Sequence, residues 1–152
     1  MNKPQLGDIV EISTAKGLAY AHYTHEHPRY GSLLRVFDNL FEKQPTDFSS
    51  VVAGKVRFST FFPLSAAINE GVFRVVHNCS VTDLNKLFPI FKTGILNPDT
   101  KKVKNWWLWD GEKEWPVETL STQQKKFPVR GIWNDTLLIA RIEQEWKPED
   151  EV

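Results

Sequence analysis

The chain has 152 residues, of which 41% are hydrophobic and 25% are charged, a globular composition that excludes a largely disordered protein. Nineteen basic residues balance nineteen acidic residues, so no long-range field of one sign concentrates nucleic acid or anionic lipid around it. A chain of this size can bury enough surface to fold without a metal or a disulfide. We therefore expect a single β-rich domain over residues 1–152.

The sequence also bears on where the protein works. Its first six residues lack the apolar segment of an export signal, and the longest uncharged stretch, residues 58–69, is too short and polar to span a bilayer. The single cysteine, Cys79, excludes an internal disulfide and fits a reducing compartment. We expect a cytoplasmic protein, with Cys79 as a small buried residue beside a strand.

Three neighbouring strands are predicted at the start of the chain. Residues 7–12 place apolar residues at even spacing, and Gly17 permits the reversal that follows. Residues 18–24 have alanines on one face and larger side chains on the other. Residues 31–37 form the third strand, because Pro28 ends the pairing before it. These segments predict a meander.

The next segment is less regular. Residues 38–54 contain turn residues and few periodic apolar positions, which predicts an irregular connection with room for one short strand. Residues 56–62 and 72–77 are strand-like, and Pro63 and Gly71 between them favour one helical turn. Five such strands predict a mainly β (α+β) fold, an antiparallel curled sheet or a small SH3-like barrel.

The second half contains two further signals. Residues 83–88 could begin a short helix capped by Thr82, but a loop is predicted, because Pro89 restricts the residue before it to extended geometry. The segment 106–115 predicts a Trp-rich β-hairpin, since Asp-Gly between alternating residues favours a two-residue turn. A short C-terminal helix is expected after Asn134 or Asp135, with apolar residues on one face: Leu138, Ile142 and Trp146. Docking of residues 137–139 as a strand is the alternative.

A two-residue turn would pair Trp106 with Trp115, and this aromatic pair is interpreted as structural. The opposite face of the hairpin would carry the residues that we predict to bind a partner: Trp107, Trp109, Glu112 and Glu114. Tryptophan is enriched at the energetic centres of protein interfaces. In the alternative, both faces are covered, one of them by the segment with Trp133 and Trp146.

Lysines precede the hairpin at positions 101, 102 and 104. A basic and aromatic surface can hold a single nucleic-acid strand by charge and stacking. The alternative function is therefore a nucleic-acid-binding small β-barrel that uses Lys101, Lys102 and Lys104 with the tryptophans. A solvated loop also accounts for these lysines, given the balanced charge.

His22, His25 and His27 lie close together in sequence, and imidazole is a zinc ligand. On a regular strand His25 and His27 would share a face and His22 would point the other way. Convergence on a metal requires the chain to leave strand geometry before His25. We expect surface histidines and no metal, and keep a hydrolase built on them as an alternative.

The sequence lacks a nucleophile elbow, a phosphate-binding glycine loop and paired helical metal ligands. We therefore predict no enzymatic activity, no catalytic residues and no cofactor. Asp8 and Glu11 could form a buried ion pair with Arg35 or Arg74, which is a more frequent role for such residues than catalysis.

The segments 7–12 and 17–21, with the strand from Gly31, resemble the opening of the immunity protein 26 family of bacterial polymorphic toxin systems. Residues 58–62 and 88–89 are similar in placement, and the resemblance spans roughly the first two-thirds of the chain. It implies a cytoplasmic protein that binds and neutralises a toxin, with steric occlusion as the mechanism. The tryptophan hairpin is outside the resemblance.

A nuclease toxin would require an acidic contact surface that mimics phosphate. Five glutamates lie near tryptophans in the sequence and could supply it: Glu112, Glu114, Glu118, Glu143 and Glu145.

Overall fold

The computed structural model describes residues 3–100 and 102–151, with the side chains of Leu96 and Lys104 excepted. Contacts within the chain group it into two compact units. Unit 1 comprises residues 1–87 and 131–146, and unit 2 comprises residues 88–130 and 147–152. The sequence predicts one domain over the whole chain, and this domain count stays a prediction.

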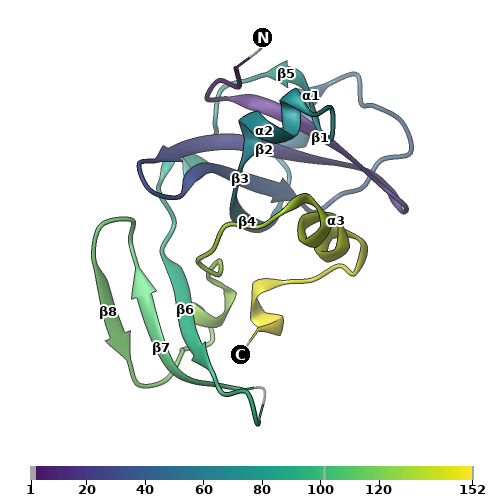
Figure 1. Ribbon diagram of the computed structural model, residues 1–152. Helices are drawn as coiled ribbons and strands as arrows, with labels where there is room; N and C mark the ends of the chain where they lie inside the picture. The colour runs from purple at the N-terminus through teal and green to yellow at the C-terminus, as the bar shows by residue number, and fades with distance from the viewer. Residues whose placement is uncertain (1–2, 101, 152) are drawn as a thin grey trace. The chain divides into compact units, whose positions relative to one another are not determined.

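Unit 1 is built on a five-stranded antiparallel sheet in the order β4-β3-β2-β1-β5 (Figure 1). Its strands are β1 (Asp8–Thr14), β2 (Gly17–His27), β3 (Gly31–Phe37), β4 (Val56–Phe62) and β5 (Arg74–Asn78). The predicted meander of β1, β2 and β3 is confirmed. The mainly β, antiparallel curled sheet is confirmed as well, and among the described residues β4 and β5 do not pair to close a barrel.

The helices of unit 1 are α1 (Phe48–Val52), α2 (Leu64–Asn69) and α3 (Asp135–Glu143), with a 3-10 turn η1 (Leu84–Lys86). The helical turn expected after Pro63 is confirmed as α2. Within residues 38–54, the β pairing is limited to one antiparallel bridge between Phe41 and Leu18. The segment also contains α1, which was not predicted and whose first turn is capped by the Asp47 carboxylate, which accepts from the Ser49 N–H at 3.0 Å. No helix among the described residues is long and apolar enough to cross a membrane.

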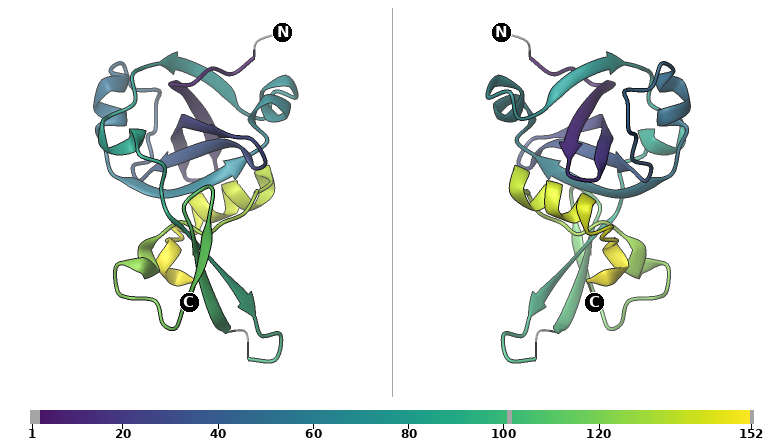
Figure 2. Two further views of the ribbon diagram at one scale, coloured as in Figure 1. Left: turned by 90° about the vertical axis from the view of Figure 1, so that its left-hand side faces the viewer. Right: turned by 90° about the vertical axis from the view of Figure 1, so that its right-hand side faces the viewer.

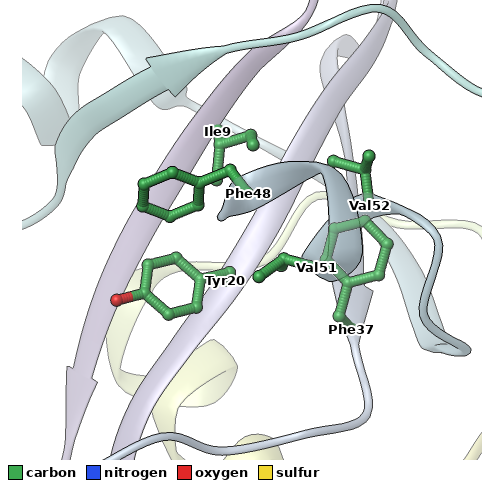
Figure 3. Close-up of a cluster of buried hydrophobic side chains, with 6 residues drawn as sticks. All are labelled: Ile9, Tyr20, Phe37, Phe48, Val51 and Val52. Atoms are coloured by element: carbon green, nitrogen blue, oxygen red, sulfur yellow. The ribbon is translucent and has the colours of Figure 1, made fainter. Parts of the chain in front are cut away.

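A hydrophobic cluster fills the space between α1 and one face of the sheet (Figure 3). Tyr20 from β2 is fully buried in it, and its ring meets Phe48 of α1 edge-on at 5.6 Å. The other members of the cluster are Ile9, Phe37, Val51 and Val52. This packing explains why a helix of only five residues is stable here, since isolated helices of this length do not persist in water.

The opposite face of the sheet is covered by α3, which lies against β1 (Figure 2). Asn134 caps the helix by accepting from the Leu137 N–H at 2.8 Å, and Leu138 and Ile142 are buried, so the predicted C-terminal helix is confirmed. Trp146 is also buried and packs edge-on against Phe58 at 5.7 Å. The alternative strand at residues 137–139 is wrong.

Unit 2 contains a three-stranded antiparallel sheet in the order β6-β7-β8. Its elements are β6 (Phe91–Leu96), β7 (Val103–Trp109), β8 (Glu114–Val117) and the 3-10 turns η2 (Gln124–Lys126) and η3 (Pro148–Asp150). Strand β6 was not predicted from the sequence. One face of this sheet carries a small core of Trp106, Leu108 and Leu120.

The tryptophan hairpin is formed by β7 and β8, but the predicted two-residue turn is wrong. Trp109 pairs with Glu114 and Leu108 with Trp115, so four residues, 110–113, make the connection. The Asp110 carboxylate accepts from the N–H groups of residues 112 and 113, both at 2.9 Å. This side-chain capping favours the longer turn over the two-residue one.

The shifted register gives Trp106 a different partner from the one predicted. Trp106 pairs with Val117 in place of Trp115. Its role in the core of unit 2 agrees with the structural interpretation, although the predicted aromatic pair is absent from the described register.

A buried lysine holds the C-terminal segment on unit 2. The Lys92 side chain is fully buried, and its Nζ donates to the carbonyl oxygens of Lys125, Pro148 and Glu151 at 2.8, 2.7 and 2.7 Å. An ammonium has three N–H donors, so its hydrogen-bonding capacity is complete. The charged tail is therefore part of the unit's packing as far as Glu151.

Candidate functional site

One side of the unit 2 sheet presents a partly exposed tryptophan beside an open hollow. Trp107 of β7 is half-buried and lies directly between Thr93 of β6 and Pro116 of β8. The hollow has a volume of about 200 Å³ and is lined by Thr93, Gly94, Ile95, Trp107, Glu114 and Arg130. Ile95 is 64% exposed, so apolar surface continues out of the hollow.

Of the four residues predicted to bind a partner, two line the hollow and two do not. Trp107 and Glu114 line the hollow. Trp109 lies on the same side of β7 but is only 6% exposed, because the rings of Phe88 and Phe91 pack against it. Glu112 lies in the turn, where its N–H donates to Asp110. Trp109 is therefore a packing residue of this face, and neither Trp109 nor Glu112 lines the hollow.

Arg130 completes the hollow and was not predicted from the sequence. Its Nη1 donates to Glu114 Oε2 at 2.9 Å, and its guanidinium lies 5.4 Å from the ring centroid of Trp109. Arg130 reaches this position because Val129 pairs with Lys92 in a parallel bridge. No local pattern in the sequence signals such a bridge between residues so far apart.

The outer edge of β6 is hydrogen-bonded at Lys92 but not at Gly94 in the described part of the chain. The Lys92 N–H donates to the Pro128 carbonyl at 2.8 Å, and the Lys92 carbonyl accepts from the Arg130 N–H at 2.9 Å. Backbone groups of alternate residues point to the same side of a strand. The N–H and C=O of Gly94 therefore also point away from β7, and in the described part of the chain they have no hydrogen-bond partner.

The other edge of this sheet is protected. Pro116 lies in the middle of β8 and has no N–H to offer an incoming strand. Proline on an edge strand is a common way to prevent unwanted pairing. The contrast leaves β6, at Gly94 beside the hollow, as the edge of this sheet that can accept another strand.

The three histidines do not converge on a metal. His22 Nε2 lies 3.0 Å from the carbonyl oxygens of both Gly7 and Cys79, and His25 Nε2 lies 2.8 Å from the Lys86 carbonyl. The ring of His27 accepts from backbone N–H groups of its own turn. Among residues 3–100 and 102–151 no group of His, Cys, Asp or Glu side chains could hold a metal ion.

The predicted faces of these histidines need a correction. His22 pairs with Arg35 and His25 pairs with Leu33, so a bulge at Thr24 places His22 and His25 on the same side of β2. The chain therefore leaves regular strand geometry before His25, and the opposite orientation of a regular strand does not apply. The expectation of surface histidines is wrong for His22, which is fully buried on β2.

Glu11 and Arg74 form the predicted ion pair, with Nη2 and Oε1 2.7 Å apart, but the pair is not buried as predicted, because the Arg74 side chain is 68% exposed and only Glu11 is buried. The Tyr20 hydroxyl also donates to Glu11 at 2.8 Å, and burial, followed by this carboxylate, raises the pKa of Tyr20. Asp8 accepts from the Asn78 side chain at 2.8 Å. Glu11 therefore has the structural role that the sequence favoured for it.

The remaining candidates from the sequence are placed as follows. Cys79 is half-buried against the cluster of Ile9 and Tyr20, and burial raises the pKa of its thiol. Lys102 is exposed, whereas Lys101 and the side chain of Lys104 lie outside the described residues.

The five glutamates proposed as an acidic surface belong to different units. Glu112, Glu114 and Glu118 are in unit 2, and Glu143 and Glu145 are in unit 1. Glu143 Oε2 accepts from the Ala15 N–H at 2.6 Å.

Comparison with known proteins gives no relative: no family model, no curated protein and no solved structure matches the chain.

Proposed function

We propose that the chain is a cytoplasmic binding protein that neutralises a bacterial toxin by occluding it, without catalysis of its own. The observation that carries the proposal is the hollow of unit 2, with half-buried Trp107 and exposed Ile95 beside an open strand edge. Aromatic and aliphatic side chains around a hollow are the usual energetic centre of a protein interface. The resemblance of the opening strands to an immunity family supplies the class of partner.

The surroundings of the hollow favour a protein partner over a small molecule. The hollow is open, and Glu114 and Arg130 already neutralise each other at its rim. An extended segment of a partner could pair with the free backbone groups of Gly94 and place an apolar side chain on Trp107, as in recognition by strand addition. Arg130 is held by Glu114 and Trp109, so it is pre-organised as part of a polar rim.

The experiment is co-expression with the toxin encoded beside the gene. The wild-type chain should restore growth, and Trp107→Ala and Ile95→Lys should each weaken the purified complex. Loss of a hot-spot tryptophan costs about 2 kcal/mol or more, a decrease in affinity of about thirtyfold. Titration calorimetry of the purified pair measures this change.

Leu6→Ala is the matched control, because Leu6 is an exposed apolar residue of unit 1. It should bind as the wild type does. A wild-type chain that fails to restore growth would remove the immunity proposal, and equal affinities for Trp107→Ala and Leu6→Ala would remove this face as its contact surface.

A further inference from the structure

A row of three polar side chains crosses the middle of the unit 1 sheet. His22 on β2 is directly opposite Arg35 on β3, and Arg35 is directly opposite Ser59 on β4. Directly opposite residues lie on the same face of a sheet. The exposed fractions of the three residues are 0%, 7% and 7%, so this polar row is buried on the face that also carries the apolar cluster of Tyr20 and Phe37.

Arg35 has no carboxylate partner in this row. Its Nε donates to Thr24 Oγ1 at 3.3 Å and its Nη2 donates to the Leu87 carbonyl at 2.6 Å. The ion pairs formed by described arginines are those of Arg57, Arg74 and Arg130, and none involves Arg35. Burial without a counter-charge lowers the pKa of Arg35 to about 10. A buried cation in this state is unfavourable unless something else compensates it.

The guanidinium retains donors for a further ligand. It has five N–H groups, of which two are used, so three remain and two of these are on Nη1. The described residues contain one fully buried side-chain nitrogen or oxygen without a partner, and this is Nδ1 of His22. Nη1 of Arg35 likewise has no hydrogen-bond partner among the described residues but is not in this fully buried class, so it reaches solvent. The same reasoning applies to the Ser59 hydroxyl, which has no hydrogen-bond partner in the part of the chain that the structure describes.

His22 does not add a second positive charge to the row. Its Nε2 faces two carbonyl oxygens, so this nitrogen carries the proton of the neutral ring. Burial is the main cause that lowers the pKa of His22, and the charge of Arg35 also contributes. At neutral pH, Arg35 is therefore the one charged member of the row.

We propose that Arg35 and Ser59 bind a small oxyanion, a carboxylate or a phosphate group, on this face of unit 1. A guanidinium with free N–H groups on both Nη atoms can donate to two oxygens of such an anion, and the Ser59 hydroxyl can donate a further bond. The ligand supplies the negative charge that no described residue provides to Arg35. This site belongs to unit 1 and does not rest on the toxin-binding proposal.

The experiment is thermal unfolding of the full chain at pH 7.5 in sodium phosphate, sodium acetate and sodium chloride at equal ionic strength. A specific ligand raises Tm along a saturable curve, because it binds the folded state alone. We expect phosphate or acetate to raise Tm above its value in chloride. The anion that does so at the lower concentration identifies the group, phosphate or carboxylate.

Variants separate binding from a merely structural role of Arg35. Ser59→Ala removes one hydrogen bond and should weaken the apparent anion affinity about fivefold. Arg35→Lys keeps the positive charge but loses the planar guanidinium that can bind two oxygens, and should weaken the apparent anion affinity about tenfold. Arg29→Met is the control, because Arg29 is exposed, and it should respond as the wild type does.

A readout that does not depend on stability is the amide and Arg Nε–H spectrum of the wild-type chain during titration with sodium phosphate or sodium acetate. Shifts should centre on Arg35 and Ser59. The site is ruled out if both anions behave as chloride does, if Ser59→Ala responds as the wild type, or if the shifts centre elsewhere.

Discussion

The ammonium of Lys92 lies 5.2 Å from the ring centroid of Trp106, inside unit 2. The same ammonium donates to three carbonyl oxygens, one from η2 and two from the C-terminal segment. A lysine on a strand thus connects the sheet to two segments that follow it much later in sequence.

Lys92→Met should destabilise unit 2, because the side chain keeps its length while three carbonyls lose their donor. Each unsatisfied group costs about 1 kcal/mol or more, so we expect a loss of about 3 kcal/mol in the free energy of unfolding. Urea denaturation followed by tryptophan fluorescence measures it. Lys126→Met, at an exposed position of η2, should change the stability by less than about 0.5 kcal/mol. Equal effects of the two substitutions would contradict the role given to Lys92.

Gly94→Ala should also be unfavourable. A Cβ at this position would lie 2.1 Å from Val103 Cγ1 and 3.0 Å from Trp106 Cε3. Overpacking of this kind costs about 1 to 3 kcal/mol. Combining it with Val103→Ala removes the closest contact, so the double variant should lose less stability than the sum of the two single changes, as a thermodynamic cycle would detect.

Gly131→Ala is the matched control for that substitution. The nearest atom to its added Cβ would be Trp133 Nε1 at 3.9 Å, which is an ordinary contact. Its stability should be near that of the wild type. A Gly94→Ala variant as stable as Gly131→Ala would show that β6 can shift to accept a side chain.

The stability of the chain should fall as the pH is lowered from 7 through the range below 6.5. Burial, more than any other cause, lowers the pKa of His22 below its ordinary value of 6.5. In this range the unfolded chain binds a proton at His22 that the folded chain does not, so protons favour unfolding. Each unit of pKa depression corresponds to about 1.4 kcal/mol.

His22→Gln should flatten this pH dependence, because an amide can still donate to the carbonyls of Gly7 and Cys79 but does not titrate. Burial also lowers the pKa of His25, so a smaller dependence should persist in the variant. Unfolding midpoints between pH 7 and pH 5 provide the comparison. An unchanged slope in His22→Gln would assign the acid sensitivity to other groups.

Asn134→Ala should destabilise unit 1 by about 1 kcal/mol, because it removes the acceptor for the Leu137 N–H at the start of α3. Asn39→Ala, at an exposed position outside any helix, serves as the reference and should have little effect. Thermal unfolding of both variants measures the difference, and a loss equal to that of Asn39→Ala would mean that water replaces the cap.

The sequence predicts the strands of unit 1 well, because their signals are local. Residues 31–37 and 56–62 coincide with β3 and β4, since turn residues define their limits and alternation defines their faces. The C-terminal helix is predicted for the same reason, with Asn134 as a recognisable cap. In these segments the intrinsic preference of the chain and its tertiary packing agree.

The features that escaped prediction depend on partners distant in sequence. β6 has no clear alternation, because fully buried Lys92 and exposed Ile95 lie within four residues of each other. The bulge in β2 depends on one extra residue, Thr24. The register of the hairpin depends on the hydrogen bonds that the Asp110 side chain accepts in the turn. The sequence could predict that Trp107 and Glu114 share one face of the hairpin, although not the register between them. Arg130 comes to them through a bridge that only the folded chain contains.

The three hydrogen bonds of the Lys92 ammonium affect when unit 2 can fold during synthesis. Pro148 and Glu151, which supply two of its three acceptors, follow Lys92 by 56 and 59 residues. While these residues remain unmade or inside the ribosome, the nascent β6 carries an ammonium whose final acceptors do not yet exist. The sheet that bears the hollow should therefore be completed only after Glu151 has left the ribosome.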